Sequence, residues 1–313
     1  MSASSRAATA PSPTLASAAD AAPQRIGRQR RPWLNRTLLS GLVFLGVIGL
    51  FTICYPFVVD WNPTEPDFGQ PTFAGPSWDH PLGTDNFGRD TLTRLAYGGR
   101  VDLVVAFVAT AVTVVVGGLL GLVCGYVGGW FDTLIMRLVD FMITIPYLVL
   151  VIAIVAILGP GNSHELPLIA RLGSGNSNLI FAIWLVGWIT YARIVRAETL
   201  VARRLEYVDA ARVIGLGNLR IMLRHILPNV VAVAIIYSMA DFVLNILVAA
   251  SLSFLGLGVQ PPNPEWGLMV AEARDFFLRD WRLMTYPGLA VMITGAAFAL
   301  IGDGLAQAMR PKG

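Results

Sequence analysis

The chain has 313 residues, of which 55% are hydrophobic and only 14% are charged, and its formal net charge is +3. This composition excludes an ordinary soluble globule and favours an integral membrane protein, with no nucleic-acid partner expected. The two cysteines, Cys54 and Cys124, lie in separate apolar segments, so they predict neither a disulfide framework nor a zinc site.

The first 36 residues form a segment of their own. Residues 1–36 are rich in Ala, Ser and Pro and carry RIGRQRR ahead of the first apolar run, which predicts a disordered, basic tail. A signal peptide is the competing interpretation. The apolar run of residues 37–59 is too long for a signal core and lacks a clear small-residue cleavage site, so we expect an uncleaved first span.

Six segments are long and apolar enough to cross a membrane, since about 30 Å of hydrocarbon takes roughly 20 helical residues. They cover residues 37–59, 101–127, 133–158, 179–200, 230–252 and 284–306. Backbone groups in lipid must be hydrogen-bonded within the segment, and these runs show no strand alternation. We therefore predict an all-α, polytopic fold with six transmembrane helices.

Arginine placement predicts the orientation, because loops rich in arginine remain in the cytoplasm. Arginines gather in the N-terminal tail, in the loop of residues 201–229 and at the C-terminal end, residues 309–313 also containing the lysine. Six crossings place all three regions on one side, so we expect both termini and this loop in the cytoplasm. The opposite side receives residues 60–100, 159–178 and 253–283.

The external segment of residues 60–100 contains a helix signal. Asp90 or Thr91 is a suitable cap for a short amphipathic helix after a glycine-containing polar turn. The apolar residues of this helix are Leu92, Leu95 and Ala96. We expect an interfacial helix on the outer membrane surface, with direct substrate contact as the alternative. Residues 101–308 would then form a five-helix core.

The sequence of the loop between the fourth and fifth spans predicts two short helices joined by a turn. Residues 206–214 favour a short helix that Gly215 and Gly217 end, Asn218 is a suitable cap for a second helix, and Pro228 is disfavoured inside one. The second helix has an apolar stripe made by Leu219, Met222, Leu223, Ile226 and Leu227. Its opposite face carries Arg220 and Arg224. Such a helix lies on the membrane surface or docks to a partner protein, and the pattern leaves both open.

Several function classes can be weighed from single residues. A phosphate-binding G-x-x-x-x-G-K-[ST] loop needs a lysine, and the chain has only Lys312, so it is not its own Walker-type ATPase. Asp140 and Asp241 lie within predicted spans, which keeps an ion-coupled secondary transporter as an alternative. For Asp140, pairing with Arg137 or with a neighbouring helix is the simpler interpretation.

A membrane-embedded enzyme is a third class. The three histidines, His80, His164 and His225, are scattered, and no H-E-x-x-H or cysteine–histidine cluster offers metal-binding geometry. We expect no metal site and no catalytic residue in the chain.

The cytoplasmic loop carries a recognisable spacing. Asp209-Ala210-Ala211, three residues, Gly215, nine residues and then His225-Ile226-Leu227-Pro228 resembles the EAA loop of binding-protein-dependent ABC importers. Asp209 replaces a glutamate of that motif and His225 an isoleucine. In that family the loop forms the coupling helix that seats in a groove of a cytoplasmic ATPase. The resemblance implies this role for Glu206, Asp209, Ala210, Ala211, Gly215, Gly217, Arg220, Arg224, His225, Leu227 and Pro228.

Three other stretches extend the resemblance over most of the chain from about Trp33. They are HPLGTDNFGRDTLTRLAYGGR at 80–100, MRLVDFMITIP at 136–146 and SFLGLGVQPPNPEWG at 253–267. All three resemble the C-type permease subunit of dipeptide, oligopeptide and nickel ABC importers, which implies the type I permease fold. The C-terminal end departs from the family's G-D-x-L-R-D, because residues 302–307 read GDGLAQ.

The resemblance implies half of a translocation pathway in a bacterial cytoplasmic membrane. The expected partners are a second permease in a heterodimer, two cytoplasmic ATPase subunits or domains, and an extracytoplasmic substrate-binding protein. No cofactor is expected on this chain, since ATP and Mg belong to the ATPases. Peptide is the expected cargo, and nickel or another small solute is the alternative. The external residues expected to face the binding protein are Asp85, Arg89, Asp90, Gln260, Pro261 and Trp266.

Overall fold

The computed structural model describes residues 35–159 and 177–309, and every regular element in these two ranges is helical. The elements are α1 (Arg36–Val58), α2 (Thr91–Val127), α3 (Gly129–Ile143), α4 (Tyr147–Leu158), α6 (Ser177–Ala202), α7 (Glu206–Val213), α8 (Asn218–Ile221), the π-helical turn η1 (Met222–Ile226), α9 (Leu227–Phe254), α10 (Trp266–Ala273), the 3-10 turn η2 (Arg274–Phe276) and α11 (Arg282–Met309). The all-α prediction is confirmed. The predicted N-terminal tail, most of the connection 159–178 with His164, and the last four residues lie outside the described residues.

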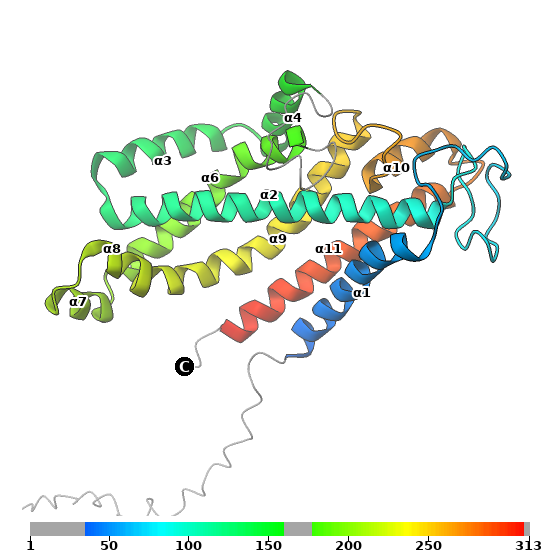
Figure 1. Cartoon of the computed structure of the whole chain (residues 1–313). Coiled ribbons are helices and arrows are strands. Elements are labelled where there is room, and N and C mark those ends of the chain that lie inside the picture. Colours follow the sequence, from blue (N-terminus) through cyan, green and yellow to red (C-terminus); the bar gives the residue numbers. More distant parts are fainter. Residues whose placement is uncertain (1–34, 160–176, 310–313) are drawn as a thin grey trace, which may run out of the picture.

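The bundle is built around α2, which runs nearly its full length (Figure 1). Helix α6 packs closely along α2 because glycines recur every fourth residue on the facing side of α2. A Cβ on Gly117 would lie 2.3 Å from the carbonyl oxygen of Trp188, and one on Gly121 would lie 2.4 Å from that of Ala192. Small residues of this kind allow two helix backbones to approach where lipid provides no hydrophobic driving force.

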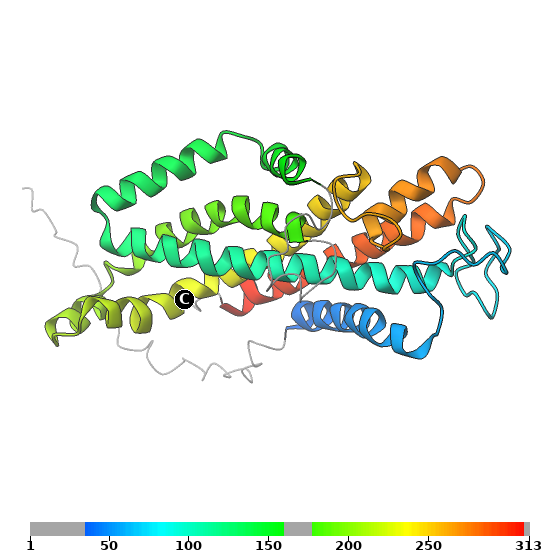
Figure 2. The same ribbon diagram turned by 45° about the horizontal axis from the view of Figure 1, so that its top comes forward.

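Helices α1 and α11 lie side by side along another face of the bundle (Figures 1 and 2). The Asn35 side chain, which caps α1, donates a 2.8 Å hydrogen bond to the carbonyl oxygen of Gly304 near the end of α11. The two ends of the described chain are therefore neighbours. This is the arrangement that an even number of crossings requires, while the side of the membrane on which they lie stays a prediction.

Five helices are long and apolar enough to span a membrane, and the count is six if the bent pair α3 and α4 forms one span. The predicted third span, residues 133–158, is wrong as a single helix. The chain bends by 91° between α3 and α4. Pro146 has no N–H to continue the helix and disfavours helical geometry at Ile145, which explains the break at this point.

The prediction of a separate interfacial helix before residue 100 is also wrong. Asp90 does cap the helix, because its carboxylate accepts a 2.7 Å bond from the Thr93 backbone N–H, but the helix runs on to Val127. Gly98 and Gly99 do not end it. A Cβ on Gly99 would lie 2.4 Å from the Trp266 ring, so these glycines provide the space in which α10 packs against α2.

The prediction that a helix ends at Pro228 is wrong as well. Helix α8, the π-turn η1 and α9 form one continuous stretch, with Pro228 in the first turn of α9. The Leu227 N–H bonds the Met222 carbonyl five residues back. The wider π-turn accommodates a residue that lacks an N–H and would otherwise press on the carbonyl of Arg224. Asn218 is the first residue of α8, and Gly217 occupies the cap position.

Candidate functional site

The α7–α8 segment (residues 206–228) projects from one end of the bundle (Figure 1). Gly215 ends the first helix with a φ of +83°, a left-handed conformation that glycine adopts without steric cost. The Gly215 N–H bonds the Arg212 carbonyl at 2.9 Å, and the Leu216 N–H bonds the Ala211 carbonyl at 3.1 Å. These bonds close a tight turn between α7 and α8, so the predicted first helix and turn are confirmed.

The inner face of the α7–α8 segment is packed onto the bundle. Val208, Ala211, Ile221 and Ile226 are buried in one cluster with residues of α2, α6 and α9. The small Ala211 side chain allows close approach of α7 to this cluster. The segment therefore rests on three long helices, α2, α6 and α9.

Polar contacts add two links between the α7–α8 segment and the C-terminal end of α2. Tyr126 donates a 2.9 Å hydrogen bond to Asn218 Oδ1 at the start of α8. Arg203, just before α7, donates to the carbonyl oxygens of Gly125 at 3.0 Å and Tyr126 at 3.3 Å. A cation at the end of a helix is favourable because the last carbonyls carry partial negative charge.

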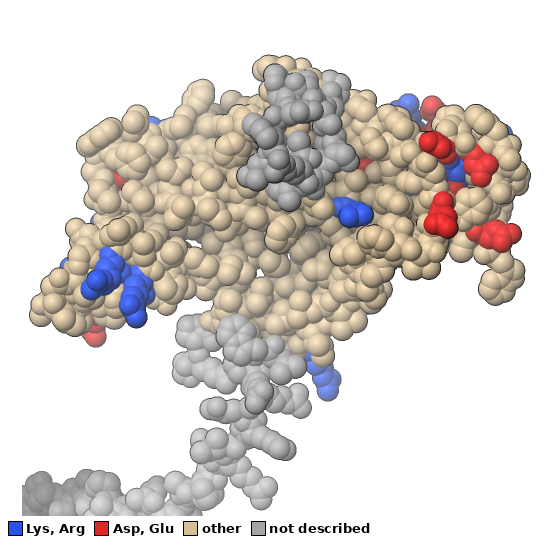
Figure 3. Space-filling model, in the orientation of Figure 1, with Lys and Arg blue, Asp and Glu red and all other residues tan. Residues whose placement is uncertain are grey.

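The outer face of the α7–α8 segment is apolar at its tip. Val213 is 88% exposed, Ile214 77% and Leu219 66%. Basic side chains surround this tip, as Figure 3 shows at the lower left. A cleft of about 410 Å³ lies beside it, lined by Tyr126, Val127, Arg212, Asn218, Leu219 and Met222. Large apolar side chains exposed together mark a surface that contacts another molecule.

The motif residues predicted from the sequence fall mostly on this outer face. Exposed are Glu206, Asp209, Ala210, Gly215, Gly217, Arg220, Arg224 and Pro228, whereas Ala211 is buried and His225 and Leu227 are half-buried. Val213 and Ile214 were missed, because no motif position marks them. Two adjacent apolar residues next to a turn glycine were the available signal.

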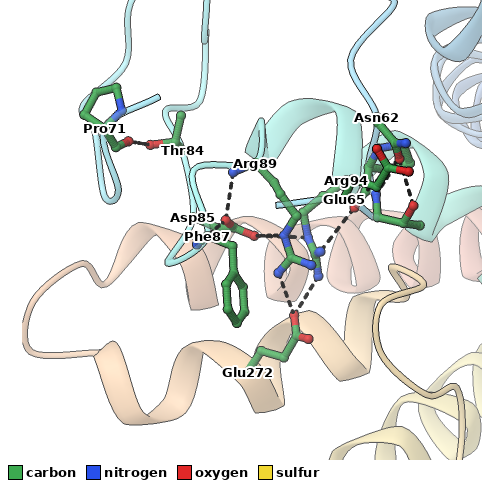
Figure 4. Close-up of polar contacts among 11 residues, drawn as sticks. Asn62, Glu65, Pro71, Thr84, Asp85, Phe87, Arg89, Arg94 and Glu272 are labelled. Atoms are coloured by element: carbon green, nitrogen blue, oxygen red, sulfur yellow. Dashed lines mark hydrogen bonds and ion pairs between the residues drawn. The ribbon is translucent and has the colours of Figure 1, made fainter. Parts of the chain in front are cut away.

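The opposite end of the bundle holds a buried network of charges (Figure 4). Arg89 Nε donates to Asp85 Oδ2 at 2.7 Å, and Arg94 donates to Glu272 Oε2 at 2.6 Å. The two pairs are close to one another, since Arg94 Nε lies 3.5 Å from Asp85 Oδ2. Arg94 is 2% exposed. The network joins the segment before α2 to α2 and α10. We call this end of the bundle the external end, after the orientation predicted from the sequence.

Further polar contacts complete the external end. His80 Nδ1 lies 3.0 Å from Asp90 Oδ1, and the backbone N–H of Trp266 donates to Asp102 Oδ2 at 3.1 Å. The Trp266 indole donates to the Leu95 carbonyl at 2.9 Å. Nearby, burial opposes ionisation of Asp280, but hydrogen bonds from Arg282 outweigh it and hold the pKa of this carboxyl below its usual value.

This geometry corrects the set of residues expected to face a binding protein. Asp85, Arg89, Asp90 and Trp266 are all buried. Their polar groups are directed at one another and at backbone atoms, so they hold the external end together rather than present a surface. Of the predicted set, Pro261 is exposed and Gln260 is partly exposed.

The two carboxylates in predicted spans have different surroundings. Asp140 on α3 is exposed and lies 3.8 Å from Arg193 of α6, not paired with Arg137. Asp241 on α9 is buried and accepts hydrogen bonds from Tyr191 at 3.0 Å and from Asn245 at 3.4 Å. Among the described residues, no group of three His, Cys, Asp or Glu side chains is placed to hold a metal ion.

The fold is that of a multi-span helical membrane protein. Residues 117–312 match the model of the family described as binding-protein-dependent transport system inner membrane component. The chain belongs to this family of importer permeases.

Curated relatives agree with this family. The chain is 40% identical over 284 residues to the di/tripeptide transport system permease protein DppC of Pseudomonas aeruginosa, covering 89% of each chain. It is 38% identical over 278 residues to the dipeptide transport system permease protein DppC of Alkalihalophilus pseudofirmus, covering 89% of this chain and 86% of the relative. It is 40% identical over 238 residues to the glutathione transport system permease protein GsiD of Pectobacterium atrosepticum, covering 76% and 74%.

Proposed function

We propose that this chain is one of two permease subunits of an ATP-driven peptide importer, and that the α7–α8 segment is the surface on which an ATPase subunit acts. The relatives named for di/tripeptide, dipeptide and glutathione transport support a peptide cargo. ATP hydrolysis belongs to the partner ATPases, and the second permease completes the pathway as a heterodimer.

The observation that carries the docking role is the exposed apolar tip on a packed base. Val213 and Ile214 expose most of their surface, while Val208 and Ile221 behind them are fully buried. An interface of this kind is an apolar centre with a polar rim, and the surrounding arginines supply the rim. Lipid is the competing contact, but the segment lies at the end of the bundle, beyond the ends of α1 and α11 (Figure 1).

The geometry supports a mechanical sequence. An external binding protein delivers the peptide, ATP closes the two ATPases, and the α7–α8 segment moves with them. Its buried face and the links through Arg203 and Asn218 carry the movement into α2, α6 and α9. We place the arginine-rich segment and both termini in the cytoplasm of a bacterium, and the charge network on the outer side.

Replacing Gly215 with valine tests this role. A β-branched residue strains the left-handed turn, whereas nothing lies within 4 Å of its Cβ, so the change acts on backbone geometry alone. We expect uptake to fall at least tenfold in the reconstituted importer, with normal membrane insertion. The control is Gly46→Val in α1, where a Cβ also meets nothing within 4 Å and φ is not positive. Normal uptake by the Gly215→Val variant would contradict the proposed docking role of the α7–α8 segment.

A further inference from the structure

Among the described residues, the buried carboxylate of Asp241 has no cationic partner. It lies near the middle of α9, where an ionised group is costly in a membrane. Within the described part of the chain, ten ion pairs join other carboxylates to arginine or histidine side chains, as at Asp85, Asp132 and Asp280, and none of them includes Asp241. Asp241 therefore differs from the paired carboxylates of this protein.

Four helices direct polar groups to this position. Asn245, one turn after Asp241, donates to Thr110 of α2 at 2.9 Å and accepts from Tyr147 of α4 at 3.3 Å. Tyr191 of α6 donates to Asp241. These contacts join α2, α4, α6 and α9 at mid-length of the bundle.

One oxygen of the carboxylate is left over. Both hydrogen bonds to Asp241 end at Oδ2, and Oδ1 accepts none from any described residue. Oδ1 is also not among the fully enclosed unpaired atoms. Asp241 is 9% exposed, whereas Tyr191 and Asn245 are 0% exposed. The carboxylate thus lies at the open edge of the cluster, with one oxygen free to accept a hydrogen bond.

The break between α3 and α4 supports a polar setting on this side of the chain. Thr144 and Pro146 lie between α3 and α4, outside both helices, and are exposed. Non-helical backbone at membrane depth is tolerated only where protein covers it or where it lines a water-filled space. Tyr147 follows directly and bonds Asn245, so the break and the Asp241 cluster belong to the same region.

We propose that Asp241 binds the α-ammonium group of a peptide in transit, with Tyr191 and Tyr237 beside it. This inference rests on the proposed peptide cargo. Peptides differ in side chains but share an ammonium group, which a carboxylate recognises by a charge-assisted hydrogen bond. Aromatic rings also attract ammonium groups, and the half-buried Tyr237 ring lies 5.5 Å from that of Tyr191, one turn before Asp241.

The first test measures uptake by the complete importer in liposomes, with both permeases, the ATPases and the binding protein. We expect Asp241→Asn, which keeps the size of the side chain, to slow uptake of a dipeptide with a free amino group at least tenfold. Co-purification of the partner subunits reports whether the variant folds and assembles. The matched control is Asp140→Asn, the same chemical change at an exposed carboxylate on α3, for which we expect uptake within twofold of the unaltered chain.

The second test reports contact and does not depend on a variant. A dipeptide with a photoreactive group on its first residue is trapped in the unaltered importer and irradiated. We expect labelling of α9 between residues 237 and 245. Labelling confined to other helices, or uptake by Asp241→Asn within twofold of normal, would overturn the inference. If the unaltered importer carries no dipeptide at all, the proposed cargo itself is wrong.

Discussion

The two ends of α2 use arginine in opposite ways. At the external end, Arg89 and Arg94 are buried, and each is paired with a carboxylate. At the α7–α8 end, Arg220 and Arg224 are exposed, and beside them Ile214 exposes an apolar side chain. A buried, paired charge fixes one arrangement, because breaking the pair leaves the partner desolvated and alone.

This difference supports the proposal that the α7–α8 segment docks a partner, while the charge network holds the shape of the external end. At the external end the charged side chains of the network pair with one another, while His80 Nε2, Thr91 Oγ1 and Asp102 Oδ1 are buried without a hydrogen-bond partner among the described residues. The α7–α8 segment leaves apolar surface in contact with solvent, which a partner would remove from water. The same substitution should therefore have different consequences at the two ends.

The largest effect is expected from Ile214→Asp. Placing a charge in the centre of an apolar interface typically costs binding as much as loss of a hot-spot residue, about 2–4 kcal/mol. A loss of about 2 kcal/mol lowers an affinity roughly 30-fold, so we expect the affinity of the permease for its ATPase to fall by at least roughly this factor. Affinity measured with purified subunits in detergent checks it. Phe68→Asp, at an 87% exposed position of the external end, is the control and should leave this affinity unchanged.

The next effect concerns stability at the external end. Arg94→Met removes the closer partner of Glu272 and leaves only the 3.9 Å contact with Arg89, which costs about 3 kcal/mol. We expect a lower thermal midpoint, with ATPase affinity unchanged. Arg274→Met removes an exposed pair with Asp275 and should change the midpoint little. Equal midpoints for the two variants would contradict the structural role of the network.

A smaller effect is expected where α2 meets the α7–α8 segment. Arg203→Met removes two hydrogen bonds to the last carbonyls of α2, a loss of about 1–3 kcal/mol for bonds to a charged group. We expect fewer peptides imported per ATP hydrolysed, while ATPase affinity stays normal. A variant that loses uptake and ATPase affinity in equal proportion would show that Arg203 only supports folding of the segment.

The smallest effect is expected from Arg212→Ala. Its 2.8 Å pair with Asp209 is exposed, and surface pairs contribute at most about 1 kcal/mol. The thermal midpoint should hardly change. A large drop would mean that the pair is buried by contacts that the isolated chain does not show.

Much of this architecture could be predicted from the sequence, because span length and apolar composition report directly on crossing a membrane. Five predicted spans and the glycine-ended helix α7 are confirmed. The 91° bend at Pro146 and the uninterrupted helix through Pro228 could not be separated, since both prolines lie in similar apolar runs. The two prolines differ in that a π-turn precedes Pro228, and this turn is seen only in the backbone of the structure.

The prediction that residues of the external end face a binding protein was wrong for a related reason. Asp85, Arg89 and Asp90 are polar residues in a loop, and such residues are usually exposed. Arg89 and Asp85 are buried in a network that includes Glu272, which lies almost two hundred residues later in the chain, so no local pattern indicates their burial. Asp90 is buried with His80 and Thr93 instead. Likewise, the contacts of Asp241 with Tyr191 and Asn245 depend on how α6 and α9 are rotated.

The most direct test of the ATPase-docking role is a cross-link from the tip of the α7–α8 segment in the assembled importer. The experiment places Ile214→Cys or Phe68→Cys in a chain whose exposed native cysteine is removed by Cys54→Ser. A short thiol-reactive cross-linker should join position 214 to the ATPase subunit and leave position 68 unlinked to it. Cross-linking of position 214 to the external binding protein, or of position 68 to the ATPase, would contradict the account.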